Sequence, residues 1–255
     1  MQIRTMYVNG DSWTFGQELR DDATDHLTYK YYNTWPWHLS RSLEIPVLHN
    51  DALGGTSNDR IYRRTLEFIK NYRGDYTELL VVPAWTTYER REVAYDKTET
   101  HNNGYSEWEQ TYVRYVSVLM NAKPNVQTGD VLQDGAIADW HKSSTILNSQ
   151  QHNANTFYNQ QYTLKHVCES LGIHLLQTYA LDNNEFAKGD ADANEDWIAD
   201  IQPVPTSMNR MLYYHPQPKT VRCPLKHPNE LGHKYIADQL LPSFTNYLNT
   251  RGQDD

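Results

Sequence analysis

Short apolar runs alternate with stretches of helical periodicity along most of this chain, and this alternation limits the possible folds more than any other feature. Four runs suit buried strands, and they cover residues 3–8, 46–50, 79–82 and 173–179. The third run is apolar without alternation, as expected for a parallel strand that is covered on both faces. The pattern predicts an α/β protein made of βα units: a single doubly wound, flavodoxin-like domain over residues 1–255, with a mainly parallel sheet and helices on both faces.

Two helices in the first third of the chain are indicated by their start and stop residues. The first begins around Thr34, has Pro36 in its first turn and ends before Pro46. The second can be capped by Ser57 or Asn58 and runs through apolar positions at helical spacing until residue 74. Both helices are expected to cover the predicted sheet.

Two further helices are predicted in the second half of the chain. One follows helical spacing from Phe157 to Leu171 and stops at Gly172. The other is capped by Asn229, and we expect Pro242 to interrupt it, so that a last turn or two restarts there.

Polar stretches interrupt the alternation in four places. Residues 17–33 favour a short helix followed by a loop, and residues 90–104 read as a polar loop. The S-x-x-E form of residues 106–109 is that of a capping box, which predicts a helix with Tyr112, Val116 and Leu119 on one side. We expect residues 123–153 to pass over one edge of the sheet and residues 183–205 to form a long surface loop. Because loops after parallel strands emerge at the carboxyl edge, the stretches 90–104 and 183–205 should border a ligand site.

Charge and cysteine content exclude several kinds of partner. The net charge is −9 with acids and bases interspersed, so the basic surface that nucleic-acid binding needs is missing. Cys168 and Cys223 form no CxxC pair, which argues against a disulfide framework and against a thiolate zinc site. No H-E-x-x-H or G-x-G-x-x-G motif occurs, so neither a metal nor a cofactor is implied.

The chain also has no stretch of about 18 apolar residues and no long apolar segment at its start. We therefore expect a soluble protein without a signal peptide, cytoplasmic or associated with a virus particle, that does not bind membranes.

The residues from Tyr7 to Gly16 form the strongest candidate site. The first apolar run stops here, so Ser12 comes at the carboxyl end of a strand, the edge at which open α/β sheets bind ligands. Gly10 permits a tight turn, Asp11 can accept bonds from nearby backbone N–H groups, and Ser12 supplies a hydroxyl. Ser12 is thus a candidate nucleophile, and the alternative is that Ser12 or Asp11 merely caps an ordinary βα turn.

Gly-Asp-Ser at residues 10–12 and His-Pro-Asn-Glu-Leu-Gly-His at residues 227–233 together resemble the SGNH (GDSL-type) hydrolases. Members of that family are α/β serine esterases, lipases and acetylesterases. The resemblance implies that Ser12 attacks an ester carbonyl and that His227 is its base. It also implies an oxyanion hole made by Ser12, Gly55 and the residue at the family's Gly-x-Asn position, which here is Thr86.

Two positions depart from the family pattern. Thr86 stands where the family has an asparagine, and a rotatable hydroxyl is a less preorganised donor than an amide. Pro224 stands where the Asp-x-x-His motif has its aspartate, which normally orients the histidine. Three alternatives follow: a backbone carbonyl orients His227, an acid from elsewhere does so, or the activity is weak or absent.

Elementary chemistry supports the Ser12 and His227 pairing without the resemblance, because a serine hydroxyl needs a nearby base that is neutral near pH 7. His233 is better interpreted as a residue that bonds within the fold. The sequence therefore favours a serine esterase that acts on a small-molecule or carbohydrate ester, such as a carbohydrate acetyl ester. The alternative is a catalytically reduced SGNH-like binding or structural protein, for example a component of a phage particle.

Overall fold

The computed structural model describes residues 2–20, 24–102, 107–119, 131–147, 150–181 and 206–251. Its strands are β1 (Thr5–Gly10), β2 (Val47–Asn50), β3 (Leu79–Trp85), β4 (Arg90–Asn102), β5 (Glu107–Leu119), β6 (His174–Leu175) and β7 (Thr178–Tyr179). Its helices are α1 (Ser12–Phe15), α2 (His26–Asn33), α3 (Trp35–Ser42), α4 (Asn58–Asn71), α5 (Val131–Leu147), α6 (Gln150–Leu171), α8 (Met208–Tyr213) and α9 (Glu230–Arg251). Two short 3-10 helices are η1 (Tyr76–Glu78) and η2 (Pro218–Val221).

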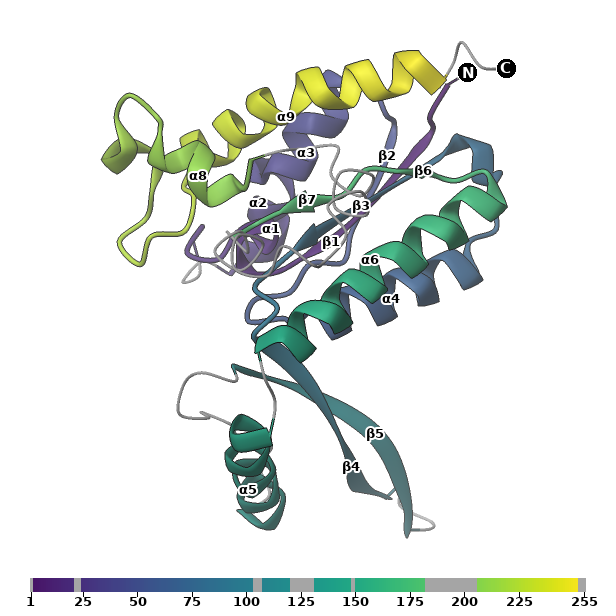
Figure 1. Cartoon of the computed structure of the whole chain (residues 1–255), viewed down its shortest axis with the longest axis vertical. Helices are drawn as coiled ribbons and strands as arrows, with labels where there is room; N and C mark the ends of the chain where they lie inside the picture. The colour runs from purple at the N-terminus through teal and green to yellow at the C-terminus, as the bar shows by residue number, and fades with distance from the viewer. Residues whose placement is uncertain are drawn as a thin grey trace.

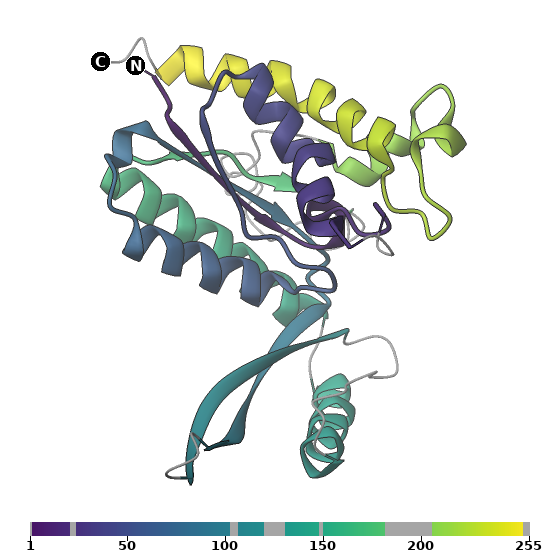
Figure 2. The same ribbon diagram turned by 180° about the vertical axis from the view of Figure 1, so that it is seen from behind.

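A parallel sheet forms the centre of the molecule, in the order β2-β1-β3-β6, with β7 also paired to β3 (Figure 1). Every pairing in this sheet is parallel, and β1 lies between β2 and β3. Figures 1 and 2 show α3 and α9 on one face of the sheet and α4 and α6 on the other. The predicted α/β class, with a mainly parallel sheet between two helical layers, is confirmed.

β1 and β3 are fully buried because the two faces of each strand pack into different cores. On β1, Met6 and Val8 pack into the core that contains α3 and α9, whereas Tyr7 packs into the core beneath α4 and α6. On β3, Leu80 packs into the first of these cores and Leu79 into the second. The apolar runs at residues 3–8 and 79–82 thus correspond to strands that are covered on both sides, whereas β2 is only partly buried.

Most of the helices predicted around the sheet are present. α3 has its proline in the first turn, and Ser57 caps α4 by accepting a bond from the N–H of Arg60. The Asn229 side chain accepts a bond from the N–H of Gly232 at the start of α9. Pro242, however, lies inside α9 and does not interrupt it. Leu240 and Phe244 are fully buried on either side of it, so packing outweighs the missing backbone bond.

The segment after β3 was predicted wrongly. Residues 90–102 form β4, where a polar loop was expected, and residues 107–119 form β5, where a helix was expected. The two strands pair antiparallel from Arg90 with Leu119 to Asn102 with Glu107. Residues 107–119 contain three valines and two tyrosines, which favour a strand once a partner is present, and this pairing overrides the local capping-box pattern. The hairpin projects away from the parallel sheet (Figures 1 and 2).

Two other stretches also differ from their predictions, and a third lies outside the described residues. In residues 17–33 the helix comes last, as α2, where the expected order was helix and then loop. The described part of 123–153 is helical in α5 and α6, and α5 lies apart from the sheet in both views, not over its edge. The predicted loop at residues 183–205 lies outside the described residues. Across the described ranges, no helix is both long and apolar enough to span a bilayer.

Candidate active site

Ser12 is the first residue of α1, directly after β1. Asp11 caps this helix, because its carboxylate accepts a bond of 3.0 Å from the N–H of Trp13. Gly10 is required by close packing, since a Cβ there would lie 2.4 Å from Oγ1 of Thr14 and 3.0 Å from Cβ of Ala84. The sharp turn therefore holds Ser12 at the carboxyl edge of the sheet, with 4% of its surface exposed.

His227 approaches Ser12 from the other end of the chain. It lies in the loop between η2 and α9, which is closed by a bridge between Arg222 and Pro228. Within the loop, the N–H of Cys223 donates to the carbonyl of His227 over 2.8 Å. Nε2 of His227 lies 3.0 Å from Oγ of Ser12. The structure thus brings together the two residues that the sequence singled out.

The carboxylate beside His227 belongs to Glu18, which the sequence analysis did not identify. Oε2 of Glu18 lies 2.8 Å from Nδ1 of His227. Glu18 also accepts bonds from the backbone N–H of Leu225, at 2.9 Å, and of His227, at 3.3 Å. An acceptor at Nδ1 favours the tautomer whose Nε2 can accept the proton of Ser12.

The electrostatics of Glu18 favour its charged form. Burial alone would raise its pKa, but the bonds from Leu225 and His227 lower the pKa below the ordinary value. Of the three alternatives left by Pro224, the geometry corresponds to an acid from elsewhere in the chain. Glu18 has a positive φ of 72° in the irregular turn after α1, and no local pattern marks such a residue as an acid partner.

Thr86 has a different role from the one expected. Its side chain is fully buried, and its hydroxyl donates to Oδ2 of Asp11 over 2.7 Å. Asn58 holds the Thr86 backbone from both sides, accepting from its N–H at 2.9 Å and donating to its carbonyl at 3.1 Å. A hydroxyl that donates to Asp11 cannot also donate to a substrate oxygen, so Thr86 supports the Asp11 carboxylate and is not an oxyanion donor.

Asp11 is a buried carboxylate with several partners directly beside the candidate nucleophile. Burial raises its pKa above the ordinary value, and the Thr86 hydroxyl, the Arg90 guanidinium and the Trp13 N–H oppose that rise. Nη1 of Arg90, the first residue of β4, lies 3.6 Å from Oδ2 of Asp11. Although residues 90–102 are not a loop, the base of this hairpin does lie at the candidate site.

Gly55 occupies a turn next to the end of β1. The preceding Leu53 donates its N–H to the carbonyl of Gly10 over 3.1 Å, which ties this turn to the strand that leads to Ser12. Gly55 has a φ of 73°, where a side chain would be strained. In the part of the chain that the structure describes, the backbone bonds of turns, loops and caps include none donated by the N–H groups of Ser12 or Gly55. They remain candidates for an oxyanion hole.

His233 belongs to the fold and not to the site, as its position suggested. It is fully buried, and its Nδ1 accepts a bond from the N–H of Trp35 over 3.3 Å. Burial lowers the pKa of His233 to about 3, so the ring is neutral.

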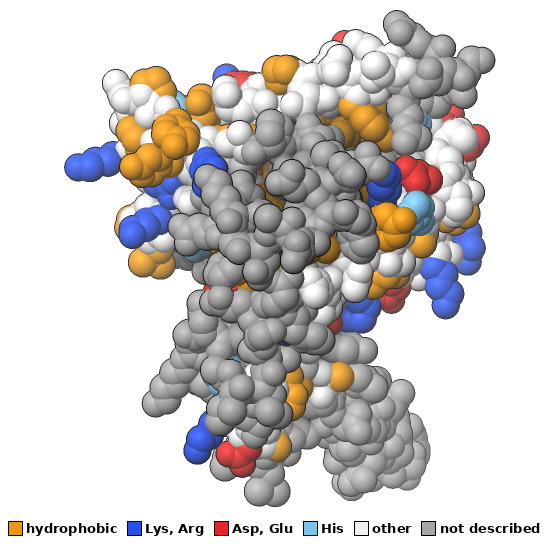
Figure 3. All heavy atoms as spheres, in the orientation of Figure 1, with side chains coloured by type: hydrophobic (Ala, Val, Ile, Leu, Met, Phe, Trp, Pro, Cys, Tyr) orange, Lys and Arg blue, Asp and Glu red, His pale blue; other side chains and the backbone are white. Residues whose placement is uncertain are grey.

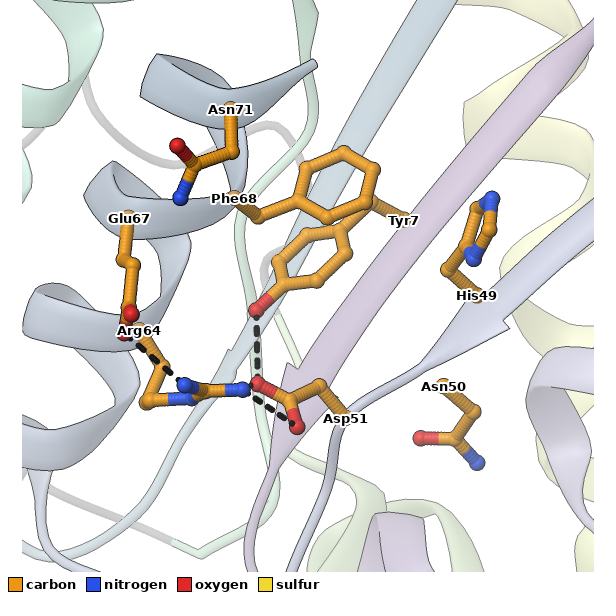
Figure 4. A pocket seen from close by; sticks show the side chains of 8 residues that line it. All are labelled: Tyr7, His49, Asn50, Asp51, Arg64, Glu67, Phe68 and Asn71. Carbon is orange, nitrogen blue, oxygen red and sulfur yellow. Dashed lines mark hydrogen bonds and ion pairs between the residues drawn. The ribbon is translucent and has the colours of Figure 1, made fainter.

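Two of the surface cavities are lined by described residues. The first has a volume of about 360 Å³ and is lined by Tyr7, Asp51, Arg64 and Phe68, among others (Figure 4). Its polar groups are bonded to one another, since Asp51 accepts from Tyr7 at 3.2 Å and from Nε of Arg64 at 3.0 Å (Figure 4). None of Ser12, Glu18 and His227 lines it.

The second cavity is next to the loop that carries His227. It has a volume of about 590 Å³, and Asn209, Tyr213, Lys219, Arg222, Pro224 and Lys226 contribute to its lining. Pro224, the residue at the family's aspartate position, thus lines a cavity. Cys223 also contributes to this lining, and neither it nor Cys168 is part of a disulfide.

Comparison with known proteins yields partial and distant likenesses. A model described as "Family of unknown function (DUF6071)" matches residues 17–134, a span that includes Glu18 but neither Ser12 nor His227. No curated protein matches the chain. A member of the lipolytic protein G-D-S-L family from Veillonella parvula DSM 2008 is 15% identical, with a TM-score of 0.48, over 95% of this chain and 98% of that one. An alpha/beta hydrolase enzyme from the metagenome of Lake Arreo, Spain, is 15% identical, with a TM-score of 0.46, over 95% of this chain and 96% of that one. At such low identity these likenesses assign no residue role to this chain.

Proposed function

We propose that this chain is a serine ester hydrolase of SGNH type, with Ser12 as nucleophile, His227 as general base and Glu18 as the residue that orients His227. One observation carries the proposal. Ser12, both ring nitrogens of His227 and the carboxylate of Glu18 form an unbroken line of hydrogen bonds, 3.0 and 2.8 Å long. This arrangement has the three roles of a Ser-His-acid triad, although its acid comes from an unexpected part of the chain.

The reaction follows from these positions. Nε2 of His227 takes the proton as Oγ of Ser12 attacks the ester carbonyl carbon, and the imidazolium that forms is stabilised by Glu18. The tetrahedral intermediate collapses to an acyl-serine, and His227 returns the proton to the departing alcohol. Water, deprotonated in turn by His227, then attacks the acyl carbonyl carbon, and as the acid is released the imidazolium of His227 returns the proton to Oγ of Ser12.

The oxyanion of the intermediate needs donors that do not have to move. We propose the backbone N–H groups of Ser12 and Gly55 for this role, since Ser12 follows β1 directly and the turn that carries Gly55, after β2, is bonded to the end of β1. Thr86 does not add a third donor, and each missing donor typically lowers the turnover number by about 10²–10³. We therefore expect slow hydrolysis of a small-molecule or carbohydrate ester.

Labelling with a fluorophosphonate probe tests this function, because only an activated serine reacts. We expect one adduct per chain in the wild type, mapped to Ser12 by peptide mass, and none in Ser12→Ala. Ser42→Ala, which removes an exposed serine at the end of α3, is the matched control and should label like the wild type. Hydrolysis of 4-nitrophenyl acetate should follow the same order.

The second candidate is an SGNH-like binding or structural protein, such as a phage-particle component, with a reduced site. The bond from Thr86 to Asp11 favours it, because it leaves the oxyanion hole one donor short. Absence of labelling and of hydrolysis in the folded wild type would support this candidate over the esterase.

A further inference from the structure

The cavity next to the His227 loop is lined by positively charged residues, although the chain as a whole is negatively charged. The chain has a net charge of −9, but Lys219, Arg222 and Lys226 all line this one cavity. Within the described ranges, no carboxylate lies within ion-pair distance of any of the three cations. In Figure 3, lysine and arginine side chains gather at the upper left, over α8 and the segment that follows it. A concentration of cations without acid partners favours the binding of an anion.

Arg222 is held in a fixed orientation in this cavity. Its Nη2 donates to the carbonyl and the side-chain oxygen of Asn209, at 3.2 and 3.1 Å, and its Nη1 donates to the carbonyl of Lys226 at 3.1 Å. These three bonds use three of the five N–H groups of a guanidinium, so two are left for a ligand. The arginine is therefore preorganised, and binding would cost little loss of side-chain freedom.

The cavity is close to the proposed nucleophile. The guanidinium carbon of Arg222 lies 5.5 Å from the centre of the Trp13 ring, and that ring lies 6.4 Å from the ring of His227. Trp13 directly follows Ser12, and Lys226 directly precedes His227. A cavity of about 590 Å³ is within the size range that holds small molecules.

We propose that this cavity binds an anionic group, a carboxylate or a phosphate, on the ester that Ser12 attacks. Lys219, Arg222 and Lys226 recognise the charge, and the exposed side chain of Tyr213, with 68% of its surface accessible, provides an aromatic wall. The inference rests on the proposed esterase function and narrows its substrate class to negatively charged esters.

The test compares 4-nitrophenyl esters that share one acyl chain and differ in its terminal group, which is neutral or anionic. The substrates are 4-nitrophenyl butyrate, which is neutral, the mono-4-nitrophenyl ester of succinate, which carries a carboxylate, and 4-nitrophenyl 3-phosphonopropionate. We expect the wild type to have a higher kcat/KM for the charged esters. The double variant Lys219→Gln, Lys226→Gln should lose about tenfold on them, mainly through KM, and nothing on the butyrate. Whichever charged ester is favoured more identifies the anion.

A second double variant separates local recognition from net charge. Lys70→Gln, Lys142→Gln changes the net charge equally, at exposed positions of α4 and α5, and should behave like the wild type on all three esters. Equal losses in the two double variants, or a wild type without preference for charged esters, would overturn the proposal.

Calorimetry measures anion binding without any hydrolysis, so it tests the cavity separately from the proposed esterase function. Monomethyl succinate and inorganic phosphate are titrated into Ser12→Ala, with and without the Lys219→Gln, Lys226→Gln pair. Binding that is lost with the two lysines supports the cavity even if no ester is hydrolysed, in which case only the esterase function fails. Absence of binding of either anion rejects the cavity as an anion site.

Discussion

The carboxylate of Glu18 lies 2.8 Å from Nδ1 of His227, although 209 positions separate the two residues in the chain. The same carboxylate accepts bonds from the backbone N–H groups of Leu225 and His227, so it fixes the loop as well as the ring. The acid thus comes from the turn that follows the candidate nucleophile, whereas the family pattern has it three residues before the histidine. One short segment, residues 12–18, therefore supplies both partners of His227.

Replacing Glu18 with glutamine removes the charge that stabilises the imidazolium, while the side chain keeps its size. In a Ser-His-Asp protease the corresponding change lowers turnover by about 10⁴, and we expect a fall of the same order in kcat for 4-nitrophenyl acetate. Glu44→Gln, at an exposed position, is the control and should keep wild-type kcat. Unchanged kcat in Glu18→Gln would show that Glu18 does not act through His227.

The lowered pKa of Glu18 also predicts how stability depends on pH. Because the folded-state pKa lies below the ordinary value of 4.5, the ionised carboxylate stabilises the fold above that pH. This contribution is lost as the pH falls through the folded-state pKa. The free energy of unfolding, measured with urea, should therefore differ more between wild type and Glu18→Gln at pH 7 than at pH 3. An equal difference at both pH values would contradict the pKa shift.

Thr86 offers a test of its bond to Asp11. Thr86→Val removes the hydroxyl but keeps the shape, leaving one oxygen of a buried carboxylate without that donor, and should cost about 1–3 kcal/mol of unfolding free energy. Thr86→Ser keeps the hydroxyl and should be closer to the wild type in urea unfolding. A large loss of kcat in Thr86→Val without any loss of stability would instead point to a direct role in the oxyanion hole.

Pro224→Asp restores the acid of the family motif and tests whether His227 lacks one. Since Glu18 already occupies Nδ1, we expect kcat for neutral 4-nitrophenyl acetate to change by less than about twofold. Pro224→Ala controls for the loss of the proline ring in the loop. A rise of tenfold or more, confined to the aspartate variant, would mean that Glu18 does not serve the histidine.

The sequence alone indicated the parallel strands of the central sheet and two of the candidate site residues, although the strand predicted at residues 173–179 is divided into β6 and β7. Parallel strands that are covered on both faces need continuous apolar runs, and helices are often preceded by a cap such as Ser57. Each of these patterns involves only a few adjacent residues, so it can be recognised in the sequence. Ser12 and His227 were found in the same way, because each sits in a recognisable short motif.

Only the tertiary structure decided the acid and the surroundings of Ser12. Whether Glu18 reaches His227 depends on the path of the chain between them, and no spacing within residues 12–18 encodes it. Likewise, the hydroxyl of Thr86 is committed to Asp11 by the pairing of β1 with β3, which aligns Gly10 with Ala84. The hairpin of β4 and β5 was missed for the same reason, since each strand is stabilised by the other, whereas the local capping-box pattern at residues 106–109 indicated a helix. Contacts between residues far apart in sequence, not local preferences, determine these features.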